Sequence, residues 1–383
     1  MNIGFFTELF PPSVGGQEQR FAALADLLAS RGHRVTVACI RHPTDCAAEE
    51  TLPSGVQVVR VAVPGCYYKP RGGMLPRSPS GMMRFAVATR RLAQAGNFDA
   101  IFLNQWPLLH IPALCRRDRL RTVVDWCEIR RSLPFRIAQR LLPKVGYANT
   151  AVSTDVALTI RRSTPGRVLV LPSGVSVTTY RDRPAPERSG LLYVGRVTRH
   201  KNLGLLIETF EELCRRGGTE KLTIAGTGPD LEAIRRRADN SPFHPGIEVL
   251  GFVSDERKVE LLSSAKVLMM TSQREGFPRV VAEAMASGLP IVTARYPQNG
   301  TVAVVQEFGS GLCANADPGA LADAVEAVAA DWQAWSARSR EHAGTLDWSS
   351  LVLRLEALLQ HTAAAAINPN FVHNLEGLPC ELL

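Results

Sequence analysis

The sequence predicts an α/β protein built from two doubly wound domains, and three observations support this prediction. Short runs rich in β-branched residues alternate with amphipathic helical stretches, a pattern typical of parallel sheets covered by helices. At 383 residues the chain is longer than one hydrophobic core usually accommodates. The two halves also open alike, each with a strand, a loop and a helix: IGFFTELFPPSVGGQEQRFAAL in the first and LLYVGRVTRHKNLGLLIETF in the second.

The expected strands follow from the apolar runs. In the first half they are Ile3–Phe6, Val35–Cys39, Val56–Val61, Ala100–Leu103, Thr122–Val124, Ala151–Val152 and Val168–Leu171. In the second half they are Leu191–Val194, Leu222–Ala225, Ile247–Leu250, Val267–Met270 and Ile291–Val292. Helices are expected between them because apolar residues recur at helical spacing, as at Phe21, Leu24 and Leu28.

The domain boundary is expected where the composition changes. The stretch SGVSVTTYRDRPAPERSG (173–190) is rich in Pro, Ser and charged residues and is interpreted as the linker. We therefore expect an N-terminal domain at 1–172 and a C-terminal domain at 173–358. The remaining residues, 359–383, show no clear periodicity and are expected to form a tail that packs back on the N-terminal domain. Ligands of doubly wound sheets bind at the carboxyl ends of the strands, so the cleft between the two domains is the expected site.

Composition narrows the class of protein. Hydrophobic residues make up 45% and charged residues 21% of the chain, and no apolar run reaches the length of a membrane span. The eight cysteines have no C-x-x-C or zinc-ligand spacing, and MNIGFFTELF lacks the features of a signal peptide, so a cytoplasmic location is expected. The net charge of +8 favours an anionic small ligand first and an anionic membrane surface second. Nucleic acid ranks third, because only 7% of the chain is aromatic and no nucleic-acid-binding module is recognised.

The stretch REGFPRVVAEAMASGLP (274–290) places two glutamates, Glu275 and Glu283, among Gly, Ala, Val and Pro. Pro278 and Gly288 predict a helix from Pro278 to Ser287 that is apolar nearly all round and therefore buried. Glu283 lies mid-helix, and a buried carboxylate needs hydrogen-bond donors. The alternative is an Arg279–Glu283 pair on a solvated helix face.

Three loops are candidates for chemistry. Gly15-Gly16 follows the first strand and allows backbone N–H groups to approach a phosphate, although a plain surface loop would fit as well. GRVTRHKN (195–202) places Arg196 and Lys201 between a strand end and a helix start, where an anion such as a diphosphate would offset their charge; ordinary surface basicity is the alternative. GTGP (226–229) is a tight turn. Neither G-x-G-x-x-G nor a P-loop motif occurs, which disfavours dehydrogenases and P-loop NTPases.

Taken together, GG near the N-terminus, GRVTRHKN, AGTGP, LGFVSDERKVELLSSAKVLMMTS and EGFPRVVAEAMASGLPIV resemble the retaining GT-B glycosyltransferases of family 4. The resemblance spans residues 1 to about 358 and implies two Rossmann-like domains facing a central cleft. It also implies transfer of a sugar from a nucleotide diphosphate donor, with a UDP-sugar favoured, to a hydroxyl of a small-molecule, lipid-linked or saccharide acceptor. The departing phosphate would itself take the acceptor's proton.

The resemblance also implies roles for single residues. Arg196 and Lys201 would bind the diphosphate, and Glu275 would contact hydroxyls of the donor sugar; these three form the expected catalytic set. Glu283 would accept hydrogen bonds from the ribose hydroxyls. The remaining donor-binding residues would be Gly16, Gly226, Gly228, Leu250, Val253, Gly276 and Phe277.

The chain departs from the family pattern at several places. A His near the sugar is replaced by VVDWCEIR, so Asp125 or Glu128 is the expected substitute. The usual P-E-x-V segment is replaced by residues 296–305, which makes Gln298 and Asn299 candidate contacts to the donor sugar. The long loop 64–81, with Tyr67 and Tyr68, would border the acceptor, although a surface loop is an equal alternative.

We expect neither a metal nor a cofactor, because the chain contains no Asp-x-Asp pair and Arg196 and Lys201 would supply the positive charge. The expected partners are a nucleotide-sugar and an acceptor, with peripheral contact to an anionic membrane at the inner face through arginines between 116 and 140 as a weaker expectation. Two alternatives remain open: a nucleotide-sugar-binding protein without turnover, and a sugar-nucleotide epimerase on the same fold.

Overall fold

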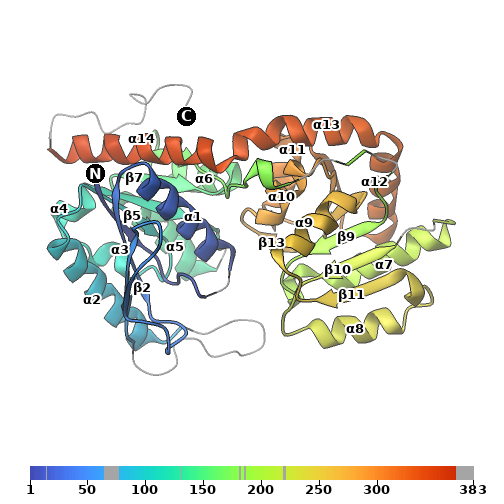
Figure 1. The fold of residues 1–383 in the computed structure, drawn as a ribbon, viewed down its shortest axis with the longest axis horizontal. Coiled ribbons are helices and arrows are strands. Elements are labelled where there is room, and N and C mark those ends of the chain that lie inside the picture. The colour runs from blue at the N-terminus through green and yellow to red at the C-terminus, as the bar shows by residue number, and fades with distance from the viewer. Residues whose placement is uncertain are drawn as a thin grey trace. The chain divides into compact units, whose positions relative to one another are not determined.

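The computed structural model describes residues 1–13, 15–63, 77–130, 132–180, 183–184, 187–218 and 221–367. The chain divides into two units (Figure 1). Unit 1 contains Met1–Pro172 together with the helix α14 (Trp348–Ile367), and unit 2 contains Ser173–Asp347. The α/β class predicted from the sequence is confirmed in both units.

Unit 1 is built on a sheet whose strand order, within the described residues, is β3-β4-β2-β1-β5-β6-β7-β8. All neighbours are parallel except β3, which pairs antiparallel with β4. The strands are β1 (Asn2–Phe6), β2 (Arg34–Ile40), β3 (Glu49–Thr51), β4 (Gln57–Val61), β5 (Ala100–Asn104), β6 (Thr122–Trp126), β7 (Ala148–Ala151) and β8 (Val168–Val170). The helices are α1 (Gly16–Ser30), α2 (Pro79–Ala95), α3 (His110–Ala113), α4 (Arg116–Arg119), α5 (Leu133–Leu141), α6 (Thr154–Arg161) and α14.

Unit 2 contains a parallel sheet of order β11-β10-β9-β12-β14-β16 and a short pair, β13-β15. The strands are β9 (Leu191–Val194), β10 (Leu222–Ala225), β11 (Ile247–Gly251), β12 (Val267–Met270), β13 (Arg274–Glu275), β14 (Ile291–Arg295), β15 (Gln298–Asn299) and β16 (Gly311–Asn315). The helices are α7 (Leu203–Arg215), α8 (Leu231–Asp239), α9 (Asp255–Ser264), α10 (Arg279–Ala286), α11 (Thr301–Glu307), α12 (Pro318–Ala330) and α13 (Trp332–Ala343).

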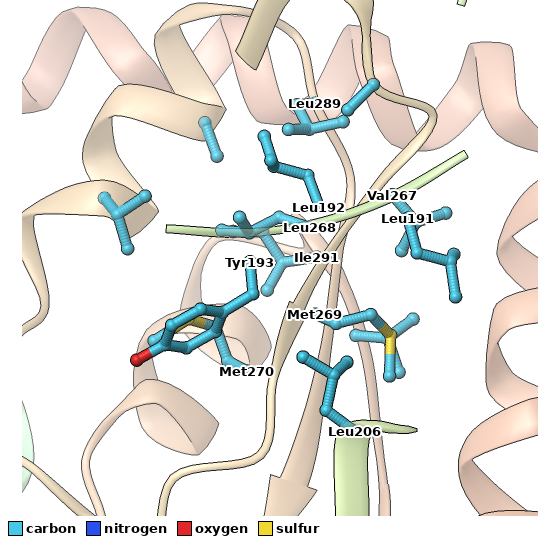
Figure 2. Packing of buried hydrophobic residues seen from close by; sticks show 14 of the residues in the cluster. Leu191, Leu192, Tyr193, Leu206, Val267, Leu268, Met269, Met270, Leu289 and Ile291 are labelled. Atoms are coloured by element: carbon cyan, nitrogen blue, oxygen red, sulfur yellow. The ribbon is translucent and has the colours of Figure 1, made fainter. Parts of the chain in front are cut away.

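The core of unit 2 lies on both faces of its sheet. Figure 2 shows Leu192 and Tyr193 of β9 packed near Met269 and Met270 of β12, with Ile291 of β14 beside them. Parallel strands covered on both sides lose all contact with water, so they are continuous apolar runs rather than alternating ones. Successive strands are added on one side of β9 (β10, β11) and then on the other side (β12, β14, β16). The strand order therefore reverses direction between β9 and β12.

The second predicted domain boundary, at residue 358, is wrong. Unit 2 ends at Asp347, and α14 belongs to unit 1. Apolar side chains of α14, among them Leu351, Leu355 and Leu358, are buried in one cluster with Phe5 and Phe102. The predicted tail therefore begins inside this helix, and residues 368–383 lie outside the described part of the chain.

Candidate functional site

The loops that follow β9 and β12 carry the charged residues singled out in the sequence. These switch-point loops, residues 195–202 and 271–278, leave the sheet of unit 2 where its strand order reverses, which is where doubly wound sheets bind ligands. Two hydrogen bonds join them: the Gln273 N–H donates to the His200 carbonyl (2.8 Å), and the Thr271 hydroxyl donates to the Lys201 carbonyl (3.0 Å). The two loops are therefore held as one connected surface.

Lys201 and Glu275 meet at this surface. The Lys201 ammonium pairs with a Glu275 carboxylate oxygen, and the two side chains are only 13% and 10% exposed. Arg196 is exposed, and its guanidinium forms no ion pair within the described part of the chain. Burial, followed by the charge of Lys201, lowers the pKa of His200 to about 4, so this imidazole is neutral at physiological pH. Arg196 and Lys201 thus place positive charge at this surface, together with the exposed Arg199 and with Arg274, which also acts on His200.

Gly226 and Gly228 allow the backbone of the GTGP turn to lie in contact with loop 195–202. A Cβ at Gly226 would lie 1.8 Å from the Gly195 carbonyl oxygen, and one at Gly228 would lie 2.0 Å from that of Val197. The Val197 N–H also donates to the Thr227 carbonyl (2.8 Å). These glycines allow two backbones to touch and thereby fix the loop that carries Arg196. Contact with a donor remains a prediction for both.

The loop Glu275-Gly276-Phe277 is supported from one side by the short pair β13-β15. The Gly300 N–H donates to the Glu275 carbonyl (3.0 Å), and a Cβ at Gly300 would lie 2.2 Å from the Gly276 carbonyl oxygen. Gly300 is thus required for the close approach that positions Glu275. This contact could not be predicted from the sequence, because Gly300 lies 25 positions beyond Glu275.

Asn299 makes hydrogen bonds inside its own loop. Its buried side chain donates to the Thr293 hydroxyl (3.0 Å) and the Ala294 carbonyl (2.8 Å), and it accepts from the Thr301 N–H (3.2 Å). All of these partners are internal, so Asn299 shapes the loop, and its predicted contact to the donor sugar stays a prediction. Gln298, its neighbour, is half-buried, and its predicted contact is untested.

Glu283 lies within α10 and is buried, as predicted. One carboxylate oxygen accepts from Lys258 (3.0 Å) and from Arg279 (3.5 Å). The Tyr180 hydroxyl also interacts with this carboxylate, and burial, aided by that contact, raises the pKa of Tyr180. The alternative Arg279–Glu283 pair therefore exists, but on a buried carboxylate rather than on a solvated face. The predicted helix start is off by one, because Pro278 caps α10 instead of opening it.

The end of β11 lies beside the GTGP turn, since the Gly226 N–H donates to the Gly251 carbonyl (2.7 Å). Leu250 and Val253 are half-buried against the core of unit 2, whereas Phe252 between them is 81% exposed. An exposed aromatic ring at a strand end offers a flat surface on which a nucleobase can stack. Phe252 was not singled out from the sequence, although it stands inside the motif LGFVSDERK.

In unit 1, Asp125 has internal partners among the described residues, and its predicted contact to the sugar or acceptor stays a prediction. It is fully buried at the end of β6. Its carboxylate accepts from Arg20 (2.7 Å), Thr150 (2.7 Å) and Gln17 (3.1 Å). With its oxygens engaged by α1 and β7, Asp125 anchors α1 to the sheet.

Glu128 and Gly16 occupy the carboxyl-end edge of the same sheet. Glu128 is half-buried and pairs with Arg130 (2.8 Å), whose guanidinium stacks on Trp106 at 4.5 Å. Gly16 is the first residue of α1, the helix that follows β1 in the chain. Both placements allow the predicted roles without testing them. Tyr67 and Tyr68 lie outside the described residues.

The described residues contain neither a membrane-spanning helix nor a cluster of metal-binding side chains. None of their helices is long and apolar enough to cross a bilayer. They also contain no group of three or more His, Cys, Asp or Glu side chains suited to a metal ion. Independence from metal remains a prediction.

Two family models match the chain. The model described as glycosyl transferases group 1 matches residues 181–344, and the glycosyl transferase 4-like domain matches residues 15–174. A GDP-mannose-dependent alpha-(1-6)-phosphatidylinositol dimannoside mannosyltransferase of Mycobacterium tuberculosis is 25% identical over 352 residues, which cover 86% of this chain and 87% of that protein. An uncharacterised glycosyltransferase of Methanocaldococcus jannaschii is 29% identical over 87% of this chain and 90% of its own.

Solved structures agree on the fold. The sucrose-phosphate synthase of Thermosynechococcus elongatus superposes with a TM-score of 0.77 at 19% identity, covering 95% of this chain and 99% of its own. The HepE protein of Anabaena, solved in complex with UDP-glucose, gives a TM-score of 0.70 at 16% identity and covers 94% of this chain and 99% of its own. These similarities confirm two Rossmann-like domains of the GT-B type.

Proposed function

Because the chain belongs to the glycosyl transferases group 1 family, we propose that it moves a sugar from a UDP-sugar to a hydroxyl of a lipid or saccharide acceptor, with retention of anomeric configuration. One observation carries the proposal: Arg196, Lys201 and Glu275 converge on the reversal point of the sheet in unit 2. Support for the donor class comes from a neighbour solved with UDP-glucose and from a relative named for GDP-mannose. Acceptors of both kinds occur in the names of similar proteins.

The proposed roles follow from charge and burial. Exposed Arg196 and the paired Lys201 bind the diphosphate, whose negative charge grows as the bond to the sugar breaks. Fixed positive charge at a leaving group is commonly the largest single catalytic contribution. Glu283 accepts the ribose hydroxyls, Glu275 accepts hydroxyls of the sugar, and Phe252 stacks on the uracil ring.

The proposed reaction needs no nucleophile from the protein. The bond between the anomeric carbon and the diphosphate oxygen breaks, and the acceptor oxygen forms its bond on the same face of the sugar. The acceptor's proton passes to the departing phosphate oxygen, so atoms and charge balance without a metal or a cofactor. Retention and metal independence follow from this route.

The test compares Arg196→Ala with a matched control, Arg236→Ala, which removes an exposed arginine from α8 of the same unit. Arg196→Ala should lower the turnover rate by about 10²–10³-fold with a smaller effect on donor affinity, and the control should be unchanged. Normal turnover in Arg196→Ala would show that Arg196 does not stabilise the leaving diphosphate.

Four further measurements address the remaining parts of the proposal. Thermal shifts with UDP- and GDP-sugars identify the base, because a ligand at 100 times its Kd stabilises by about 2.7 kcal/mol. Release of free UDP only when acceptor is present distinguishes a transferase from a protein that merely binds the donor. NMR of the product reports its anomeric configuration, and inversion would contradict the route. Activity should survive excess chelator, and restoration of lost turnover by a divalent ion would contradict metal independence.

A further inference from the structure

Helix α5 of unit 1, labelled in Figure 1, has an apolar side that is exposed. Leu133, Ile137 and Leu141 are 67%, 51% and 55% exposed. They stand four residues apart and therefore form one stripe along the helix. Gln139 on the opposite side is buried. A helix that folds against a core in water normally has the reverse arrangement.

Specific contacts hold α5 in this orientation. Phe135 packs edge-on against Trp106, with ring centroids 5.7 Å apart, and the Arg130 guanidinium lies 5.1 Å from the Phe135 ring. The Gln139 amide donates to the Arg130 carbonyl (3.2 Å). The inner side of the helix is thus fixed by an aromatic ring and a polar anchor, and the aliphatic stripe is left facing outward.

The charged residues on α5 and just after it are all basic. Arg136 and Arg140 are exposed on α5, and Lys144 is exposed just after it. Between Glu128 and Asp155 the sequence contains no Asp or Glu. The adjacent helix α6 adds exposed Leu158. An exposed aliphatic stripe flanked by cations is typical of helices that lie in the headgroup layer of a membrane.

We propose that this surface, the α5 face (Leu133, Arg136, Ile137, Arg140 and Leu141), docks unit 1 on a membrane that contains anionic lipid. The aliphatic side chains enter the boundary between headgroups and acyl chains, and the two arginines pair with lipid phosphates. The concentration of positive charge selects an anionic surface over a second copy of the chain, because two such faces would repel each other. The proposal concerns unit 1 alone and does not depend on the donor, the acceptor or turnover.

Vesicle flotation at low salt tests the proposal directly. The full chain should float with vesicles of equal parts phosphatidylcholine and phosphatidylglycerol and not with phosphatidylcholine alone. Ile137→Glu should lower the partition coefficient by about ten-fold, because it puts a carboxylate into the stripe beside anionic lipid. Arg136→Gln and Arg140→Gln should each lower it by about five-fold, equivalent to about 1 kcal/mol per charge. Moderate salt should weaken binding by screening.

The matched control is Leu353→Glu, which places the same carboxylate on an exposed leucine of α14 in the same unit. Its partition should equal that of the unaltered chain, and urea unfolding should show both variants folded. Failure to float at low salt, or equal losses in the Ile137 and Leu353 variants, would overturn the proposal. So would light scattering that shows a dimer broken by Ile137→Glu without any vesicle binding, since the face would then join two copies.

Discussion

Replacing Glu283 by Gln should weaken the binding of free UDP and destabilise unit 2 at the same time. The amide keeps the shape of the side chain but removes the charge that Lys258 and Arg279 face at 3.0 and 3.5 Å. Because Glu283 and Lys258 are only 5% and 16% exposed, loss of this charged hydrogen bond should cost about 2 kcal/mol of unfolding free energy. If the carboxylate also holds the ribose, the Kd of UDP should rise by about 10–100-fold.

A double-mutant cycle with Lys258→Met separates the two effects. Lys258→Met removes the excess positive charge that Glu283→Gln leaves behind, so the pair of substitutions should cost less stability than the sum of the single ones. The coupling free energy should be about 1–2 kcal/mol. The affinity for UDP should stay low in the double variant, because the ribose acceptor is still missing.

Urea unfolding gives the stability of each variant, and titration calorimetry with UDP gives the affinity. Unchanged UDP affinity in Glu283→Gln would show that this carboxylate does not hold the ribose. Recovery of affinity together with stability in the double variant would show that Glu283 acts only through the structure of α10. Either result refutes the assignment, whereas low affinity in a stable double variant supports it.

Three other outcomes are expected. Glu275→Gln should not weaken the binding of free UDP, because it releases Lys201 from its ion pair, and should raise the Kd of a UDP-sugar relative to that of UDP by about ten-fold, the value of one charge-assisted hydrogen bond; equal losses by calorimetry would contradict the division of roles. Gly226→Ala should lower the unfolding free energy by more than about 3 kcal/mol, since its Cβ would lie 1.8 Å from the Gly195 carbonyl oxygen. In the control Gly204→Ala, at the start of α7, the new methyl meets none of the described residues within 4 Å, and a gain of about 0.5–1 kcal/mol in urea unfolding is expected. Burial lowers the pKa of His110 to about 3, against a weaker opposing effect of the Asn104 backbone. Below about pH 6.5 the unfolded chain binds a proton at His110 and the folded chain does not. The free energy of unfolding is therefore unaffected by His110 above that pH and decreases as the pH falls toward 3. Between about pH 7 and pH 5, the unfolding free energy of His110→Leu should therefore fall by about 2 kcal/mol less than that of the unaltered chain. Equal dependence of the two unfolding free energies on pH would contradict the burial effect.

The interior strands could be predicted from the sequence because parallel strands buried on both faces are plain apolar runs. Strands β9, β10 and β12 have the predicted bounds, and β7 is displaced by three residues at its start. The missed strands lack that signal. β3 is an edge strand of three polar residues, β13 and β15 have two residues each, and β16 opens on a glycine.

The candidate site was predictable where a residue has a motif of its own and not where its role depends on a distant partner. Glu275 and Glu283 stood out because the residues around them are mostly apolar, and Lys201 because it lies with Arg196 between a strand end and a helix start. Lys258 could not be assigned to Glu283, since nothing in the sequence shows that α9 packs against α10 with those two side chains facing.

The internal partners of Asp125 were not predictable for a similar reason. Its three partners come from α1 and β7, and a carboxylate at a strand end looks the same in the sequence whether it faces a ligand or an arginine. The domain boundary failed because the helical pattern of α14 shows that it is amphipathic without showing which core its apolar side joins.

Because α14 packs on unit 1, the two units cannot complete folding in the order in which they are synthesised. Unit 2 is one uninterrupted stretch whose ends meet, since the Val175 N–H donates to the Leu346 carbonyl (2.9 Å). It can fold as soon as residue 347 has emerged. Unit 1 begins synthesis first but must wait for Leu351, Leu355 and Leu358 to cover Phe5 and Phe102. Until then its aromatic core has an uncovered side, and this is where a nascent chain would need protection by a chaperone.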